Sequence, residues 1–380
     1  MRMTSAEPEH PLLAAVRTSD TAAMAALLEP YDSPHARGPH LAAALRLAAD
    51  ALDQRALDAL LLLADAEELG LNAADADGRT PLLRAVARGA HDIALALHFA
   101  GSDPRARDRE GRDALALARP HPALLTHFEW TSGIATPFAE LLARALTEPD
   151  VDHPVWGATT VAAASRKGPR ALRLVLDAAA TLQHHPDPLA RCFGAEVLRL
   201  INLYDQSGEE EESPFDTLLV DLFLPWAARE EDPRVLRPLT TGLAEAMEPR
   251  AEEPMPGLTR HADAQVRAAA VGGLHWPVRQ GRADALAAAL ACTRDTDAQV
   301  REAACRALLN APADDPAPSD ALAARLADPE EAVRITAAIR LALRDDPRGD
   351  DLLDALDRTI DRTSPYYWDM DQVRRHRRNR

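Results

Sequence analysis

The sequence predicts an all-α fold built from tandem repeats of paired helices, and three observations support this prediction. The 380 residues exceed one ordinary globular domain, so a single hydrophobic core is not expected. Apolar residues make up 47% of the chain and aromatic residues only 4%, a balance that suits short, closely packed helices better than sheets. Short segments with the same spacing of Asp, Gly, Pro and Val also recur, which is typical of a repeat solenoid.

The clearest repeat in the first third of the chain reads D-A-D-G-R-T-P-L-L-R-A-V-A-R-G. In this segment Gly78 can form a turn, Thr80 can cap a helix, and Pro81 fits the first helical turn, where its missing N–H costs nothing. Gly111 follows Gly78 at a spacing of 33 residues. Weaker copies precede this unit at residues 11–16 and 41–63.

This segment resembles an ankyrin repeat, and the resemblance extends over about residues 10–120. It departs from the ankyrin pattern at Leu83, where a histidine is usual. The resemblance implies helix pairs joined by hairpin loops, and a protein-binding fold without a particular partner.

A second repeat follows from Phe138 onward. The motif D-A-Q-V-R-x-A-A-x-x-x-L occurs at Asp263–Leu274 and again at Asp297–Leu308, and a third copy begins near Leu326. As a result, valines recur at spacings of 34 and 33 residues, at Val266, Val300 and Val333. A fixed period with paired helices predicts a solenoid.

The second repeat resembles the HEAT repeat over about residues 138–360, so we expect residues 138–362 to be almost wholly helical. Loops are expected at the Pro- and acid-rich segments 205–214, 248–257 and 313–318. The predicted domains are ankyrin-like repeats at 1–130, HEAT-like repeats at 131–363, and a tail at 364–380.

An arginine follows the valine in each HEAT-like copy, at Arg267, Arg301 and Arg334. The resemblance implies that these arginines pair with acids of neighbouring repeats. An acid also stands four residues before each of them, a spacing that suits ion pairs within one helix; these acids are Asp263, Asp297 and Glu330. The alternative is a nucleic-acid-binding stripe, as in HEAT-like proteins that resemble alkylpurine glycosylases.

The net charge favours the pairing interpretation. The chain carries 60 acidic and 43 basic residues, a formal charge of −17, and it contains an acidic run at Glu209–Glu212. Such a surface repels nucleic acid and attracts cations. We therefore expect a basic protein partner whose affinity falls as salt rises, and no nucleic-acid partner.

No sequence motif indicates catalysis. The chain has no G-x-G-x-x-G, P-loop, G-x-S-x-G or H-E-x-x-H string, so we expect no catalytic residue and no cofactor. Two groupings contain metal-ligating residue types, His184 and His185 near Cys192, and His261 near Asp263. Because neither grouping has regular ligand spacing, no metal site is expected.

The cysteines and the N-terminus bear on localisation. Three cysteines without C-x-x-C spacing indicate neither a disulfide framework nor a zinc ribbon. Residues 1–10 lack the apolar core of a signal peptide, and no apolar run is long enough to span a membrane. We expect a cytoplasmic protein with no membrane partner.

The sequence therefore predicts a non-catalytic protein-interaction scaffold. Arginines cluster at the second ankyrin-like hairpin and are candidate contacts for a partner; they are Arg105, Arg107, Arg109 and Arg112. Acids interleave with them, so a solvated mixed-charge tip is the alternative. Trp276 is a further candidate, as a binding anchor or as a core residue beside Pro277. The rival function is an enzyme on a HEAT scaffold, similar to the DNA glycosylases or bilin lyases.

The tail joins an aromatic group, Tyr366–Trp368, to an arginine-rich end, Arg374–Arg380. We expect the aromatic side chains to cap the last repeat, since terminal units of a solenoid must cover their apolar face. We expect the arginines to lie on the acidic body rather than to bind nucleic acid.

Overall fold

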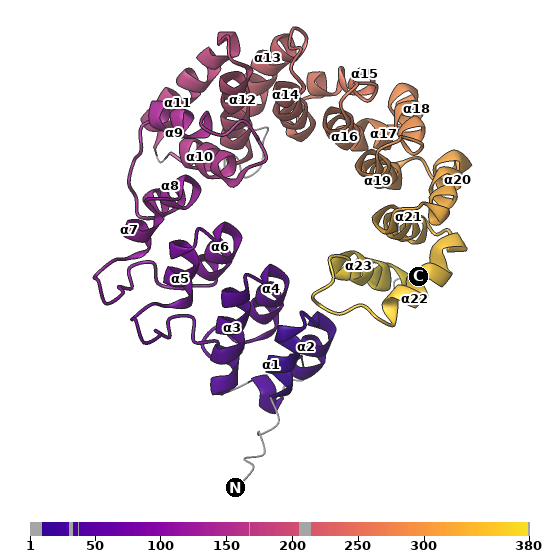
Figure 1. The fold of residues 1–380 in the computed structure, drawn as a ribbon. Coiled ribbons are helices and arrows are strands. Elements are labelled where there is room, and N and C mark those ends of the chain that lie inside the picture. Colours follow the sequence, from indigo (N-terminus) through magenta and orange to yellow (C-terminus); the bar gives the residue numbers. More distant parts are fainter. Residues whose placement is uncertain (1–9, 30–32, 37, 167, 205–213, 379–380) are drawn as a thin grey trace. The chain divides into compact units, whose positions relative to one another are not determined.

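The computed structural model describes residues 10–29, 33–36, 38–166, 168–204 and 214–378. Within these ranges the chain forms 23 α-helices, six short 3-10 helices and no β-strand (Figure 1), which confirms the predicted all-α class. None of the described helices is both long and apolar enough to cross a membrane. The acidic run Glu209–Glu212 and the last two tail residues lie outside the described residues.

The helices form two compact units. Unit 1 comprises residues 1–136 with 360–367, and unit 2 comprises residues 137–359 with 368–380.

Unit 1 consists of helix pairs that stack on one another. Its helices are α1 (Pro11–Arg17), α2 (Thr21–Leu28), α3 (Pro39–Ala51), α4 (Gln54–Leu63), α5 (Pro81–Ala87), α6 (His91–Phe99), α7 (Ala114–Ala118) and α8 (Pro122–Thr131), with a 3-10 helix η1 (Pro34–Ala36). Each odd-numbered helix packs on the next odd-numbered one and on its own even-numbered partner. One continuous core of Leu and Ala side chains runs through the stack, from Leu12 to Phe128.

Two hairpin loops of unit 1 have the same internal geometry. In the first, the Asp75 carboxylate accepts hydrogen bonds from the amides of Asp77 and Arg79, both at 2.9 Å. In the second, Asp108 accepts from Glu110 at 3.0 Å and from Arg112 at 2.9 Å. Each loop closes at a glycine with positive φ, Gly78 at 76° and Gly111 at 77°. Residues with a side chain rarely adopt this conformation, which explains why both positions are glycine. The two glycines are 33 residues apart because they occupy the same place in successive hairpins.

The predicted helix start after the first hairpin is also confirmed. The Thr80 hydroxyl accepts a hydrogen bond from the Leu83 amide at 3.3 Å, and Pro81 opens α5. The two hairpins contact each other, because the Arg109 amide donates to the Asp77 carbonyl at 3.0 Å.

Unit 2 contains the remaining helices. They are α9 (Phe138–Ala145), α10 (Pro154–Ala164), α11 (Pro169–Thr181), α12 (Pro188–Leu203), α13 (Pro214–Ala227), α14 (Pro233–Glu245), α15 (Met255–Leu258), α16 (Ala264–Gly272), α17 (His275–Arg279), α18 (Ala283–Cys292), α19 (Ala298–Ala307), α20 (Pro316–Ala324), α21 (Glu331–Leu343), α22 (Asp350–Asp357) and α23 (Tyr367–Arg378). Short 3-10 helices join them: η2 (Leu182–His184), η3 (Pro249–Glu252), η4 (Leu308–Asn310), η5 (Arg325–Ala327) and η6 (Pro347–Gly349).

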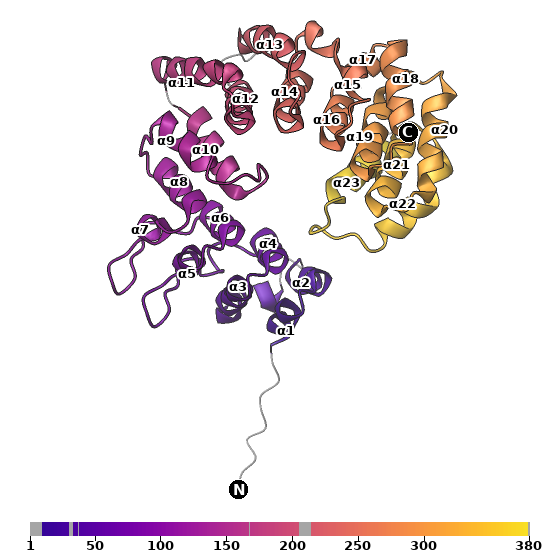
Figure 2. The same cartoon turned by 45° about the horizontal axis from the view of Figure 1, so that its top comes forward.

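One row of helices runs through unit 2 and forms its framework. In this inner row each helix packs on the next, in the order α10, α12, α14, α16, α19 and α21, while α11, α13, α18, α20 and α22 lie on the opposite, outer side (Figures 1 and 2). Four consecutive inner helices begin after an aspartate whose carboxylate accepts backbone N–H groups of the first turn; the aspartates are Asp187, Asp232, Asp263 and Asp297. The aspartate of the Asp-Pro pairs before α12 and α14, and that of the D-A-Q motif before α16 and α19, is therefore a helix cap.

Two segments predicted as loops contain helical turns, so that prediction is wrong for both. Residues 248–257 hold η3 and most of α15, and residues 313–318 include the start of α20. The loop prediction depends on the prolines of these segments, since proline usually ends or interrupts a helix. However, Pro316 and Pro318 lie in the first turn of α20, where the backbone N–H groups have no partner within the helix.

The tail folds as α23, and two of its arginines pair with acids of α22. Arg374 pairs with Asp357 at 2.6 Å, and Arg377 pairs with Asp350 and Asp354. The prediction for the arginines is thus confirmed for Arg374 and Arg377, whereas Arg375 pairs with Asp371 of its own helix. The prediction for the aromatic side chains is wrong for Trp368, which is 69% exposed, because Met370 and Val373 supply the buried side chains of α23.

A histidine pair, with His127 buried and His98 half-buried, lies between α6 and α8. The Nδ1 atom of His98 and the Nε2 atom of His127 are 2.8 Å apart, and Phe128 and Trp130 lie against the His127 ring. Burial, followed by the neighbouring His98 and His91, lowers the pKa of His127 from 6.5 to about 4. Burial also lowers the pKa of His98. The pair is therefore neutral at pH 7.

Because of this pair, we expect the free energy of unfolding of unit 1 to fall as the pH is lowered. Because the folded-state pKa of His127 is below the unfolded value, the unfolded state binds more protons between about pH 6.5 and pH 4. Unfolding free energy should therefore fall by about 2–3 kcal/mol across this window, relative to a His127→Gln variant. Urea unfolding of both proteins at several pH values measures the difference, and parallel pH profiles would contradict it.

Candidate functional site

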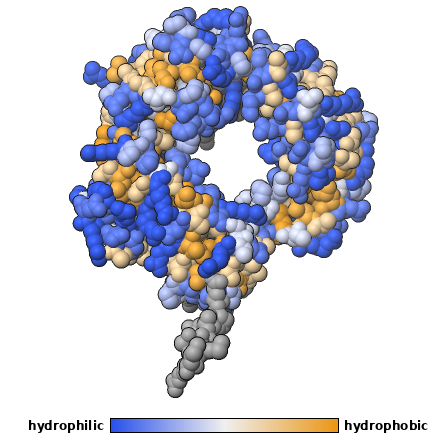
Figure 3. All heavy atoms as spheres, in the orientation of Figure 1, coloured by the Kyte–Doolittle hydropathy of each residue, from blue (hydrophilic) through white to orange (hydrophobic). Residues whose placement is uncertain are grey.

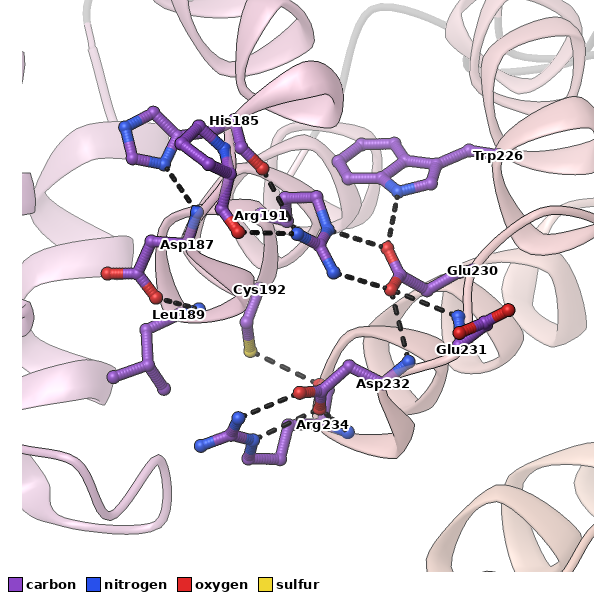
Figure 4. Close-up of polar contacts among 11 residues, drawn as sticks. His185, Asp187, Leu189, Arg191, Cys192, Trp226, Glu230, Glu231, Asp232 and Arg234 are labelled. Atoms are coloured by element: carbon purple, nitrogen blue, oxygen red, sulfur yellow. Dashed lines mark hydrogen bonds and ion pairs between the residues drawn. The ribbon is translucent and has the colours of Figure 1, made fainter.

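Figure 4 shows how an arginine on α12 joins one repeat of unit 2 to the next. Its Nη1 atom donates to the carbonyl oxygens of His185 and Pro186 at 3.0 and 3.2 Å. The Nε and Nη2 atoms of this residue, Arg191, donate to the two oxygens of Glu230 at 2.9 and 2.8 Å. Glu230 precedes α14 and also accepts from the Trp226 indole at 3.2 Å. Planar bidentate contacts of this kind fix geometry as well as charge.

The same arrangement recurs at the arginines of the V-R motif. Arg267 on α16 donates to the carbonyls five and six residues before it and to Asp295. Arg301 on α19 repeats this with Asp328 as its acid. Arg334 on α21 donates to the corresponding pair of carbonyls. We call Arg191, Arg267 and Arg301, with their acids Glu230, Asp295 and Asp328, the arginine ladder.

The arginine side chains of the ladder become more deeply buried from Arg191 to Arg301. The Arg301 side chain is 9% exposed and that of Asp328 is fully buried. Hydrogen bonds from Arg301 hold the pKa of Asp328 below its usual value, and the same bonds raise the pKa of Arg301. Solvent and salt screen such a pair only weakly.

The ladder confirms one expectation for these arginines and contradicts another. The acids of Arg267 and Arg301 belong to the neighbouring repeat, as the resemblance implied, whereas Arg334 donates to the carbonyls of Asp328 and Pro329. The pairing within one helix is wrong for Asp263 and Asp297, since both accept backbone amides at the start of their helices instead. Because the guanidinium groups of Arg267 and Arg301 each donate four hydrogen bonds within the chain, these two arginines do not form a stripe for phosphate binding.

Three arginines at the start of the outer-side segments form a second set of pairs. Each contacts an acid two residues away and an acid of the preceding repeat: Arg250 with Glu248 and Asp221, Arg282 with Asp284 and Glu252, and Arg348 with Asp346 and Asp320. These pairs are solvent-accessible and contribute little stability individually. They nevertheless neutralise the positive charges of Arg250, Arg282 and Arg348.

A pocket of about 370 Å³ lies between α10, α12 and α14. Arg199 pairs there with Glu196 and Glu245 at 2.7 and 2.9 Å, and Arg237 pairs with Asp152 at 2.7 Å. Cys192 donates to the Arg234 carbonyl at 3.2 Å, and burial raises the pKa of its thiol to about 12. The pocket thus offers paired charges and an unreactive thiol, which suits contact with polar side chains better than proton transfer.

An apolar groove of about 260 Å³ lies between α11, α12 and α13. Its walls include Leu176, Ile201, Leu218 and Leu222, and the nearby Leu174 is 62% exposed. Apolar side chains gather over this part of unit 2 in Figure 3, on a face that is otherwise mostly hydrophilic. Sequence reasoning missed the groove, because an apolar stripe on a helix does not reveal which of its positions a neighbour covers.

The four hairpin arginines of unit 1 have different surroundings. Arg112 makes a bidentate contact with Asp108 at 3.0 and 2.8 Å, so it holds its own loop together. Arg107 donates to the Gly111 carbonyl at 3.1 Å. Arg105 and Arg109 are exposed, and no carboxylate among the described residues pairs with them. A pocket of about 330 Å³ between this loop, α7 and α8 is lined by Arg105 and Arg107.

The tryptophans of unit 2 at positions 156, 226 and 276 also divide into two groups. Trp156 and Trp226 are buried and fill the core. Trp276, at the start of α17, is 46% exposed, and the Arg279 guanidinium lies 5.3 Å from its ring centroid. Of the three, Trp276 is thus the one whose ring is available to a partner.

His185 and His261, for which no metal site is expected, accept backbone amides just before α12 and α16. The Nδ1 atom of His185 accepts from the Asp187 amide, and that of His261 accepts from the Asp263 amide, both at 3.1 Å. A different grouping, His10, His35 and His40 in unit 1, brings three possible ligand atoms within 4.8 Å of one another. Sequence reasoning missed this grouping because its members come from separate helices.

Comparison with known proteins identifies one segment of the chain. Residues 251–344 match the HEAT-repeat family model. The matched segment contains two of the three contacts of the arginine ladder, at Arg267 and Arg301. The match does not reach residues 10–120, so the ankyrin-like resemblance there remains a prediction from the sequence pattern.

Solved structures show only loose similarity. The Escherichia coli protein YibA is 15% identical, with a TM-score of 0.44 over 65% of this chain and 95% of its own. An engineered protein is 19% identical, with a TM-score of 0.43 over 95% of this chain and 98% of its own. A chain from a study of Kap95p binding to RanGDP is 14% identical, with a TM-score of 0.37 over 96% of this chain and 49% of its own. No curated protein matches the chain.

Because of the ladder, we expect two substitutions on α19 to lower the free energy of unfolding by unequal amounts. Arg301→Ala should lower the unfolding free energy of unit 2 by about 3 kcal/mol, because it removes the bidentate contact of the buried Asp328 and leaves this charge only the longer contact with Arg325 at 3.4 Å. Arg306→Ala is the matched control. It removes an ion pair with Glu302 from a side chain that is 59% exposed, and should cost less than about 1 kcal/mol. Urea unfolding measures both, and equal costs would contradict the assigned role of Arg301.

Proposed function

We propose that this protein is a non-catalytic scaffold that binds a basic protein partner through its repeat surfaces. The HEAT repeats of residues 251–344 support a binding role, since stacked repeats offer an extended surface for recognition. The three buried thiols are compatible with the reducing cytoplasm that we propose as its location.

The observation that carries the proposal is where the positive charges lie. Arginines of the ladder and of the outer pairs are bonded to acids of their own chain, in a protein whose formal charge is −17. Other acids lie exposed at the N-terminal ends of the inner helices, among them Glu231, Glu330 and Glu331. This distribution favours a basic partner and fast association.

Two further features support specific contacts. We propose that the hairpin region of unit 1, within ankyrin-type repeats at residues 10–120, contacts acidic groups of the partner through Arg105 and Arg109. We also propose that Trp276 is an aromatic anchor, since exposed tryptophan and arginine often dominate the binding energy of an interface.

The rival proposal, an enzyme similar to the DNA glycosylases or bilin lyases, has less support. The carboxylates that line the pocket of α10, α12 and α14, Asp152 and Glu196, are both paired with arginines. A general acid or base needs a shifted pKa and access to a substrate. The mixed charge of this pocket also differs from the basic face that would bind DNA.

The proposal predicts a charge-dependent affinity. The immobilised protein should capture a basic protein from cells that produce it. The Kd of that purified partner should rise at least about tenfold between roughly 50 and 300 mM salt. A Glu330→Gln, Glu331→Gln variant should weaken binding several-fold, because both charges lie at the start of α21.

The control carries the same charge change elsewhere. Glu253→Gln, Asp351→Asn removes two exposed acids on the outer side of unit 2 and should leave the Kd nearly unchanged. An acidic partner, a salt-independent Kd, or equal effects of the two variants would contradict the proposal.

A further inference from the structure

Three histidines meet at one edge of unit 1. His10 immediately precedes α1, His35 lies in η1, and His40 lies in the first turn of α3. One nitrogen atom of each ring can be chosen so that all three lie within 4.8 Å of one another, and each residue is half-buried.

The spacing of two of these nitrogens fits a common metal. The Nε2 atom of His10 and the Nδ1 atom of His35 are 3.3 Å apart. With metal–nitrogen bonds of about 2.0–2.1 Å, tetrahedral geometry separates two ligand atoms by about 3.3–3.4 Å. The His10 and His40 rings are stacked, with centroids 4.1 Å apart, so binding requires these two rings to tilt toward a common point.

The third histidine is already oriented by an outer contact. The Nε2 atom of His40 lies 2.8 Å from the His35 carbonyl oxygen, to which it can only donate. In the neutral ring this leaves the Nδ1 lone pair for a metal ion. Metal-binding histidines are typically held in this way, with the second nitrogen donating to a carbonyl or carboxylate.

Electrostatics favours the neutral, metal-binding form. Burial, followed by the charges that His40 and His35 would carry, lowers the pKa of His10. One contact opposes binding, because the Nδ1 atom of His10 accepts a hydrogen bond from the Leu12 amide at 3.3 Å. Ligation through Nε2 places the proton on Nδ1 and gives up this long bond, which is a small loss beside a metal–nitrogen bond.

We propose that His10, His35 and His40 bind one zinc-type divalent transition-metal ion, with water in the fourth position. Imidazole ligands suit zinc, copper and nickel rather than magnesium or calcium. The ion would tie η1 to the starts of α1 and α3. The proposal departs from the expectation from the sequence that the chain has no metal site.

The test is Zn²⁺ titration of the full chain by calorimetry, with Co²⁺ absorption to report the coordination number. His10→Asn, His35→Asn and His40→Asn should each weaken Zn²⁺ binding at least tenfold, since each removes one of three ligands. The wild type should bind one ion and give a four-coordinate Co²⁺ spectrum.

A matched control separates ligation from capping. His153 precedes Pro154 as His10 precedes Pro11, and its Nδ1 atom accepts the Val155 amide at the same 3.3 Å. Asparagine can cap either helix, so His153→Asn should leave Zn²⁺ affinity unchanged, and circular dichroism verifies that each variant is folded. The proposal is overturned by a wild type that shows no saturable one-to-one binding. It is equally overturned by folded histidine variants that bind as the wild type does, or by a six-coordinate Co²⁺ spectrum.

Discussion

The bidentate bond between an arginine of one repeat and a carboxylate of the next is the contact on which the order of unit 2 depends. Repeat proteins have no single core, so their stability depends on each junction between neighbours. Apolar packing alone permits small shifts of one helix along another. The planar contact between Arg301 and Asp328, completed by two carbonyls of the loop before α19, fixes the position of that junction.

This use of arginine also determines the character of the surface. A guanidinium that already donates to a carboxylate and two carbonyls has little capacity left for a phosphate. The ladder arginines are therefore engaged within their own chain, while acids such as Glu330 and Glu331 lie exposed. Arg105 and Arg109 differ from the ladder, because no carboxylate among the described residues pairs with them. A partner with a basic surface and a few acids matches this pattern.

Local features were predictable from the sequence. Asp263 and Asp297 mark helix starts because an aspartate accepts amides from the first turn next to it, and Gly78 marks a turn because only glycine readily adopts positive φ. The acid that pairs with Arg267 could not be identified in advance. Asp295 lies 28 residues later, and its position depends on the length of α18 and of the two loops around it.

The three-histidine grouping was hidden for the same reason. His10 and His35 are 25 residues apart, and neither has a ligand motif nearby. Their proximity results from the stacking of α1 on α3 and from the path of η1, which no local pattern encodes. Likewise, the sequence does not show that Trp156 is buried and Trp276 half-exposed, because the packing of neighbouring repeats decides which ring is covered.

The most direct measurement of the role of the ladder is native-state hydrogen exchange of Arg301→Met compared with the wild type. If the bond couples adjacent repeats, backbone amides of both α19 and α21 should exchange faster in the variant, while those of α10 and α12 stay protected. Faster exchange confined to the turn of α19 around residue 301 would contradict the account, since it would show that the bond does not couple the repeats.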